Sequence, residues 1–412
     1  MTHSQKLFLR NITLLIASTM TVMAGATIAP ALPDMEKAFH DVANAELLIK
    51  MVMTIPGLVI AVCAPLIGIL LDKWQKKPLL IIAALLYGLA GTSGFFLSDS
   101  LYAILAGRVL LGVAVAGIMV GCTTLIADYF TGARRSHYMG LQAGFGAFGG
   151  VIFIAAGGVL ADINWTVPFL IYLSAFIILP GLLLFINEPG QHDSDDGTHQ
   201  PATITGDQPA RKTIWFIVFC YFLALIEILV LYLVPVHYPF FINTLEKVSN
   251  SNIGYGIALM LLVMATTSSA YRYFKSYLSF QLLHGIGLLI LATGYFLIGL
   301  GDSYLETLPG LIVAGVGLGI MRPNLVVWLM SFTSPQVRGL VMGGLTTSFF
   351  VGQFICPLLS QPIILAYGYA SMFHWVGLAL LLLALSFICL FLLLKNATKC
   401  CHPNSDAVLK VE

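Results

Sequence analysis

The sequence predicts an all-α integral membrane protein with twelve spanning helices, arranged as two pseudo-symmetric six-helix bundles. Three observations lead to this prediction: the apolar composition, a succession of long apolar runs, and a polar stretch near the middle of the chain. The 412 residues are 58% hydrophobic and only 9% charged, whereas soluble domains are typically about 25% charged. A soluble fold of this length could not cover so much apolar side chain, so lipid is the solvent that fits.

Twelve apolar runs follow one another, each near or above the roughly twenty residues that cross a hydrocarbon core as a helix. In the first half they occupy 11–32, 47–71, 78–97, 101–126, 137–160 and 166–186. In the second half they occupy 214–240, 252–270, 278–300, 308–331, 339–366 and 371–394. Strands are excluded, because an open sheet edge in lipid leaves backbone groups without hydrogen bonds.

A polar stretch at 187–212 separates the two sets of runs. It contains no apolar run and is rich in Asp, Gly, Pro and Thr, so it cannot bury enough surface to fold. We therefore expect a six-helix bundle over 1–186, a disordered cytoplasmic linker over 187–212, a second bundle over 213–396 and a cytoplasmic tail over 397–412.

The two halves also repeat each other in sequence. Each carries a Gly-Ile-Met, a Phe-Thr and a Met-Gly pattern at closely matching spacings. The patterns are Gly117–Met119, Phe130–Thr131 and Met139–Gly140 in the first half, and Gly319–Met321, Phe332–Thr333 and Met342–Gly343 in the second. An offset of about 200 residues in the same direction predicts parallel repeats, related by an axis along the membrane normal.

The distribution of Lys and Arg predicts the orientation in the cytoplasmic (inner) membrane. With both termini in the cytoplasm, fifteen Lys and Arg residues fall in inner segments. Only Lys37, Lys50 and Lys247 are assigned to the outer loops. Because positive residues accumulate on the cytoplasmic side, we expect both ends of this multi-pass protein to be inside.

The segment after the second span carries a motif: Gly68, then Asp72 and Lys73, then further lysines at 76 and 77. It resembles the loop signature of the major facilitator superfamily, and the helix count, the linker and the repeat extend this resemblance to the whole chain. The resemblance implies two bundles around a central cavity and secondary transport by alternating access.

The same resemblance implies a conformational latch. Asp72 would approach the start of the helix that begins near Arg338, where free amides and the helix dipole favour an anion. Lys73 would pair with Asp128. This cluster, with Gly68 before it, would form only when the cytoplasmic ends of the halves meet, and so would stabilise the outward-open state. The alternative is that the lysines serve topology alone.

Glu227 lies at the middle of the seventh span, flanked by Leu and Ile residues. A charged side chain at a helix centre costs roughly 2.5–3.5 kcal/mol on insertion scales, so it must line a cavity or find a partner. Desolvation favours the protonated acid there, as a proton carrier requires. The alternative is a neutral acid that fixes one helix to another by hydrogen bonding.

Arg322 lies slightly inside the middle of the tenth span and is followed by Pro323. One interpretation is a cavity guanidinium presented to a carboxylate or phosphate group, with Asn324 and Trp328 as neighbours in the substrate cavity. The other is that Arg322 satisfies a carbonyl that the proline frees.

Arg108 lies about 10 Å from the outer end of the fourth span. It matches the helix 4 arginine of proton-driven antiporters of the superfamily, which implies a place in the substrate cavity. The alternative is an arginine whose guanidinium extends to the outer interface.

A few other polar residues receive weaker interpretations. His237, at the outer end of the seventh span, could titrate near neutrality, but it is interpreted first as an interfacial residue. Asp34, at the outer end of the first span, is interpreted as solvated. Cys400, Cys401 and His402 are too few for a metal site by themselves, and a lipid anchor is the other role considered for them.

The predicted function is secondary active transport of a small organic solute, anionic, zwitterionic or amphipathic, coupled to protons. Multidrug efflux by proton antiport and proton-driven import of an organic anion both stay open, with a membrane-embedded enzyme as a remote alternative. No catalytic, metal or nucleotide-binding pattern is found, so we expect neither an enzyme nor a cofactor. The expected partners are the solute, protons and lipid; we expect no nucleic acid, and a monomer.

The latch leads to a first test. Replacing Asp72 by Asn removes the anion from the predicted cluster, so the resting population should shift toward the inward-facing state. The measurement is cytoplasmic labelling of a cysteine placed in the cavity, which should increase. Unchanged labelling would reduce the segment to a topology signal.

Overall fold

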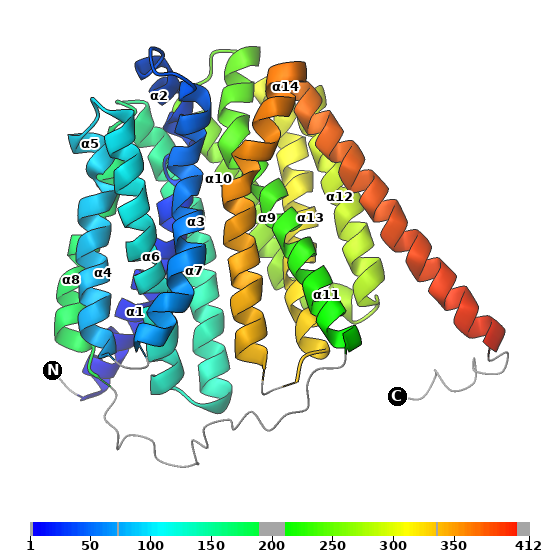
Figure 1. Ribbon diagram of the computed structural model, residues 1–412, viewed down its shortest axis with the longest axis horizontal. Helices are drawn as coiled ribbons and strands as arrows, with labels where there is room; N and C mark the ends of the chain where they lie inside the picture. Colours follow the sequence, from blue (N-terminus) through cyan, green and yellow to red (C-terminus); the bar gives the residue numbers. More distant parts are fainter. Residues whose placement is uncertain (1–2, 72–73, 189–210, 335–336, 402–412) are drawn as a thin grey trace.

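The computed structural model describes residues 3–71, 74–188, 211–334 and 337–401, and every regular element in these ranges is helical (Figure 1). Asp72, Lys73, residues 189–210 of the predicted linker and most of the predicted tail lie outside the described residues. The all-α membrane fold is thus confirmed.

The first half consists of α1 to α8, with two 3₁₀-helices. Their bounds are α1 His3–Ala26, η1 Ala29–Ala31, α2 Leu32–Ala38, α3 Ala45–Leu71, α4 Lys76–Gly91, α5 Ser93–Phe96, α6 Leu101–Tyr129, α7 Gly132–Ala161, η2 Val167–Leu173 and α8 Ser174–Phe185. Six helices of this half are long and apolar enough to span a membrane.

The second half consists of α9 to α14. Their bounds are α9 Arg211–Leu245, α10 Asn250–Ser269, α11 Tyr271–Lys275, α12 Phe280–Leu300, α13 Tyr304–Ser331 and α14 Arg338–Cys401. Five candidate spans lie here, of which the last, Arg338–Cys389, is 52 residues long.

The long helix α14 is two spans joined at Gly368. This residue has φ = 82°, a backbone conformation that glycine adopts without a steric penalty. The chain reverses there without a loop, as Figure 1 shows at the top of α14. Counting both parts of α14, the described chain has twelve crossings, as predicted.

Serine caps begin four of the spans. The hydroxyls of Ser100, Ser249, Ser279 and Ser303 each accept a hydrogen bond from the backbone N–H three residues later. These bonds satisfy donors that a helix leaves free at its start. Ser100 and Ser303 precede α6 and α13, which carry the two Gly-Ile-Met patterns, so the sequence repeat is visible in the helix starts as well.

The two halves lie side by side, with α3 next to α14 and α7 next to α10 (Figure 1). We call the two ends of the bundle the Arg338 end, where α14 begins, and the Gly368 end, where it turns. Within the described residues, every hydrogen bond between the halves lies at the Gly368 end. The structure is therefore closed at that end.

The crossing of α7 and α10 leaves no room for a side chain at Gly158. A Cβ atom there would lie 2.6 Å from the carbonyl oxygen of Asn250 and 3.1 Å from Cα of Ser251. Glycine lets the two helix backbones approach closely, as small residues do in membrane helix pairs.

Replacing Gly158 by Ala should therefore lower the stability of the purified protein by about 1–3 kcal/mol, the range for overpacked sites. The measurement is thermal unfolding in detergent. Gly140→Ala, on the same helix, is the matched control, because an added Cβ there meets nothing within 4 Å. Equal losses in the two variants would contradict the assignment of a close crossing.

Candidate functional site

Glu227 is the most isolated polar group of the spans. It lies at the middle of α9, its side chain is 1% exposed, and neither carboxyl oxygen has a hydrogen-bond partner in the described part of the chain. Burying a polar group without partners is costly, and more so for a charge. The position therefore suits a protonated carboxylic acid in this conformation. Within the described residues, Glu227 makes no hydrogen bond to a second helix.

Arg322 approaches the same region from α13. It is partly exposed, its guanidinium lies 4.6 Å from the centre of the Phe349 ring on α14, and it is close enough to interact electrostatically with Glu227 and Tyr232. A cation above an aromatic face is stabilised by the ring quadrupole. The structure thus brings together the acid and one of the arginines that the sequence singled out.

Asn324 and Trp328 do not share this site. Asn324 is buried, where it accepts a hydrogen bond from the Tyr271 hydroxyl at 3.2 Å and donates one to the carbonyl of Phe280 at 2.9 Å. Trp328 stacks on Phe280, with ring centres 6.2 Å apart. Both side chains therefore tie α13 to its neighbours within the second half, on a different face of the helix from Arg322.

Arg108 is fully buried. Its Nη1 donates to the Tyr172 hydroxyl at 2.9 Å, and that hydroxyl donates to the carbonyl of Ala24 at 3.0 Å. The guanidinium also lies 4.7 Å from the centre of the Phe169 ring. Nε and Nη2 have no partner within the described residues. Arg108 therefore joins α6 to η2 and α1 in this conformation, and its role in solute binding stays a prediction.

Of the predicted latch residues, the structure describes Gly68, Asp128 and Arg338, and each of these three has separate surroundings. Asp72 and Lys73 lie outside the described residues. Asp128 forms an ion pair with Lys76, and the exposed Arg338 donates to the carbonyl of Thr333 at 3.3 Å. Gly68 has open space around it. The helix that was expected to begin near Arg338 does begin there.

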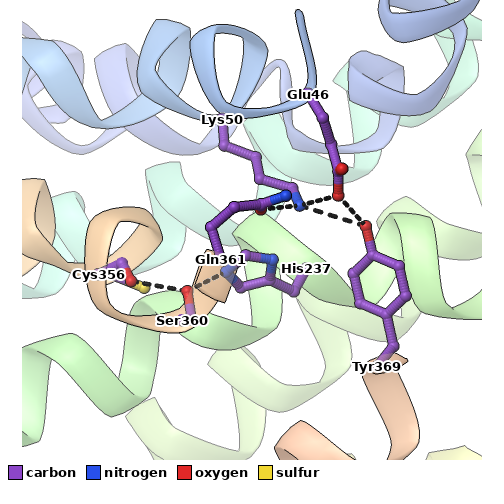
Figure 2. Close-up of polar contacts among 7 residues, drawn as sticks. All are labelled: Glu46, Lys50, His237, Cys356, Ser360, Gln361 and Tyr369. Carbon is purple, nitrogen blue, oxygen red and sulfur yellow. Dashed lines mark hydrogen bonds and ion pairs between the residues drawn. The ribbon is translucent and has the colours of Figure 1, made fainter. Parts of the chain in front are cut away.

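A polar cluster at the Gly368 end was not predicted from the sequence (Figure 2). The Nζ atom of Lys50 on α3 donates to Glu46 at 2.6 Å, to the Gln361 side-chain oxygen at 2.6 Å and to the Tyr369 hydroxyl at 3.2 Å. The Tyr369 hydroxyl in turn donates to Glu46 at 2.8 Å. We call these four residues the Lys50 cluster.

The assignment of Lys50 to an outer loop was wrong, because this residue lies in the second turn of α3 and is 0% exposed. The signal that could have placed it is Glu46, one turn earlier. An acid and a lysine at positions i and i+4 of a helix lie on the same face and can pair.

His237 and Asp34 are also less solvated than expected. His237 is fully buried, with its Nε2 atom 2.6 Å from the Ser360 hydroxyl. Asp34 accepts a hydrogen bond from the Asn250 side chain at 2.7 Å, across the two halves. Asp162 accepts from the backbone N–H of Asn250 at 2.7 Å, at the start of α10, where the helix dipole favours an anion.

The cysteine and histidine group at the end of α14 is not placed. His402 lies outside the described residues, and the side chains of Cys400 and Cys401 are not described.

Twelve membrane crossings, in two halves that repeat each other in sequence, are the architecture of a polytopic membrane transporter. The profile of the Major Facilitator Superfamily matches residues 14–343. The chain therefore belongs to the Major Facilitator Superfamily; it is a secondary transporter of small solutes and not an enzyme.

Among its relatives, the class H tetracycline resistance protein of Pasteurella multocida is 24% identical over 403 residues, which cover 92% of this chain and 94% of that protein. Multidrug resistance protein 1 of Bacillus subtilis (strain 168) is 23% identical and covers 85% of this chain and 89% of its own length. The bacillibactin exporter of the same organism is 31% identical over 172 residues, which are 39% of this chain and 41% of the exporter.

Solved structures share the fold. The D-xylose-proton symporter has a TM-score of 0.78 at 15% identity and covers 92% of this chain and 97% of its own. A bacterial homologue of the human lysosomal transporter Spinster, in an inward-facing and unoccupied conformation, has a TM-score of 0.76 at 16% identity. The match covers 94% of this chain and 97% of the homologue.

The Arg108 contacts lead to a test of what this residue does in the present conformation. Replacing Tyr172 by Phe removes the only hydrogen-bond acceptor that the described residues offer to the Arg108 guanidinium. Leaving a buried donor unpaired should cost about 1–3 kcal/mol of stability, measured by thermal unfolding in detergent. Tyr102→Phe, at a residue that is 64% exposed on α6, is the control and should leave the unfolding temperature unchanged. A loss of the same size in the control would contradict the assignment.

Proposed function

We propose that this protein is a proton-coupled exporter of a small amphipathic organic solute, anionic or zwitterionic, in the cytoplasmic membrane. The halves rock about a central site, which opens in turn to each side. The observation that carries the proposal is Glu227, a fully buried acid without a hydrogen-bond partner in the described chain, beside the Arg322 charge.

Glu227 would act as the proton carrier. A carboxyl group that is neutral when buried and ionised when hydrated gains or loses its proton as the halves rock, because the two states differ in the solvation of the charge. Arg322 would stabilise the ionised form when the proton leaves. Proton release and solute binding are then linked through one electrostatic interaction.

Arg322 also supports the solute class. Its guanidinium rests on the Phe349 ring and is partly exposed, which leaves N–H donors for a carboxylate or phosphate oxygen. The aromatic ring next to it offers an apolar surface. A solute with an anionic group and an apolar body fits both neighbours, and Arg108 would add positive charge in a conformation that exposes it.

Export is favoured over import by the relatives. The three relatives reported above are named resistance proteins or an exporter. Proton-driven import of an organic anion is the second candidate, and the partly exposed Arg322 is the observation that supports it.

The closed Gly368 end supports an inward-facing assignment. The Lys and Arg distribution places the Arg338 end in the cytoplasm, and the cross-half hydrogen bonds of the described residues close the other end. The latch of Gly68, Asp72, Lys73, Asp128 and Arg338 would form in the opposite state, which agrees with the separate partners of Asp128 and Arg338 here.

The test uses membrane vesicles with an imposed pH gradient. Everted vesicles, acidic inside, should accumulate tetracycline or an aromatic carboxylate in exchange for protons, whereas right-side-out vesicles should accumulate the solute only if the protein imports it. Accumulation in right-side-out vesicles alone would overturn export in favour of import.

Replacing Glu227 by Gln should abolish the pH dependence of transport while the protein still folds, because the amide has nearly the same volume as the carboxyl group but does not ionise. Asp41→Asn is the control, since Asp41 is 90% exposed at the Gly368 end. Retained proton coupling in Glu227→Gln would remove this residue from the mechanism.

A further inference from the structure

Lys50 is unusual in being a fully buried cation whose three ammonium protons all have acceptors. The acceptors are the Glu46 carboxylate, the Gln361 side-chain oxygen and the Tyr369 hydroxyl (Figure 2). The ring of Phe240 lies 4.8 Å from Nζ and adds a cation–π contact. An ammonium group has three donors, so this site satisfies Lys50 completely.

The partners of Lys50 belong to different halves. Glu46 lies one turn away on the same helix, α3, so the ion pair can form whether or not the halves are in contact. Gln361 and Tyr369 lie on α14, on either side of the Gly368 turn, and Phe240 lies on α9. The cluster is therefore complete only when the second half closes against α3.

The two partners of Lys50 in the second half have side chains that can separate from it at low cost. Gln361 and Tyr369 are neutral, so their separation from Lys50 leaves the lysine paired with Glu46 and exposes no lone charge. An acid in their place would leave a separated ion pair on opening, which is strongly unfavourable in a low-dielectric region. A purely apolar contact would lack the specificity that hydrogen bonds give to one arrangement of the halves.

We propose that Lys50 is the positioning residue of a gate at the Gly368 end: its hydrogen bonds to Gln361 and Tyr369 hold that end closed and set the balance between the two transport states. This inference rests on alternating access as proposed above. Opening of the gate exchanges two neutral partners for water while the pair with Glu46 persists.

The experiment measures the distance between the halves at the opposite end. Spin labels are attached to cysteines introduced at Gly140 on α7 and Gly343 on α14, in a chain whose seven native cysteines are replaced by alanine. An added Cβ at either glycine meets nothing within 4 Å, so both labels are tolerated. Closing of the Arg338 end brings the labels together and appears as a short-distance population.

Lys50→Met and Tyr369→Phe should raise the short-distance population by at least about tenfold, because each weakens a buried charged hydrogen-bond network. Lys50→Arg keeps the charge and several donors, so it should restore much of the parent distribution. Lys247→Met is the control: Lys247 is an exposed lysine between α9 and α10 at the same end, without a hydrogen bond or ion pair among the described residues. The distance distribution of this variant should equal that of the parent protein.

The outcomes separate the gate from the transport cycle. If Lys50→Met and Tyr369→Phe leave the distribution of the folded protein unchanged, Lys50 is not the gate residue. Should Lys50→Met fail to fold, Tyr369→Phe decides, because it removes a single oxygen atom. If the parent protein and every variant show one distance at both high and low proton concentration, alternating access itself fails and the gate fails with it.

Discussion

A charge inside a membrane protein has no water to solvate it, so each one must carry its partners with it. The charged side chains of the described spans differ greatly in how far this requirement is met. Lys50 has an acceptor for every ammonium proton. Arg108 has the Tyr172 hydroxyl and the faces of the Phe169 and Tyr172 rings, and Glu227 has no hydrogen-bond partner among the described residues. The satisfied charge holds elements together; the unsatisfied acid is the group that gains most from a change of surroundings, which a transport cycle provides.

Arg322, a charged residue inside a span, is also a position where the two repeats differ. In the repeat alignment Arg322 on α13 corresponds to Val120 on α6, and the Gly-Ile-Met patterns before them are the same. The shared positions build two bundles with matching helix starts, such as those at Ser100 and Ser303. An exactly repeated chain would place like charges opposite each other across the central axis. The residues that differ between the repeats therefore allow the two halves to have different functions, although their helices are arranged in the same way.

Helix positions and helix starts could be predicted well from the sequence, because hydrophobic length and the cost of unpaired backbone groups depend on composition alone. The start of α14 at Arg338 is one example. The neighbours of each polar residue could not be predicted from the sequence, because they depend on how the helices pack against one another. Asn324 was grouped with Arg322 by its closeness in the chain, although two residues correspond to roughly 200° around a helix. Lys50 was counted as a loop residue because its cross-half partners lie more than 300 residues away.

The turn at Gly368 determines the position of the next residue, Tyr369. Tyr369 directly follows the one residue of α14 with a positive φ, so the backbone reversal that begins the last span also sets the direction in which the tyrosine ring leaves the chain. Its hydroxyl reaches Glu46 and Lys50 from there. The backbone conformation at Gly368 thus determines both the chain reversal and the position of the Tyr369 hydroxyl in the gate. A substitution that changed one would also change the other. Relatives that have a lysine and an acid one turn apart on the second span should then also have, at this turn, a glycine followed by a residue with a hydroxyl group. The two features should occur together in sequence alignments.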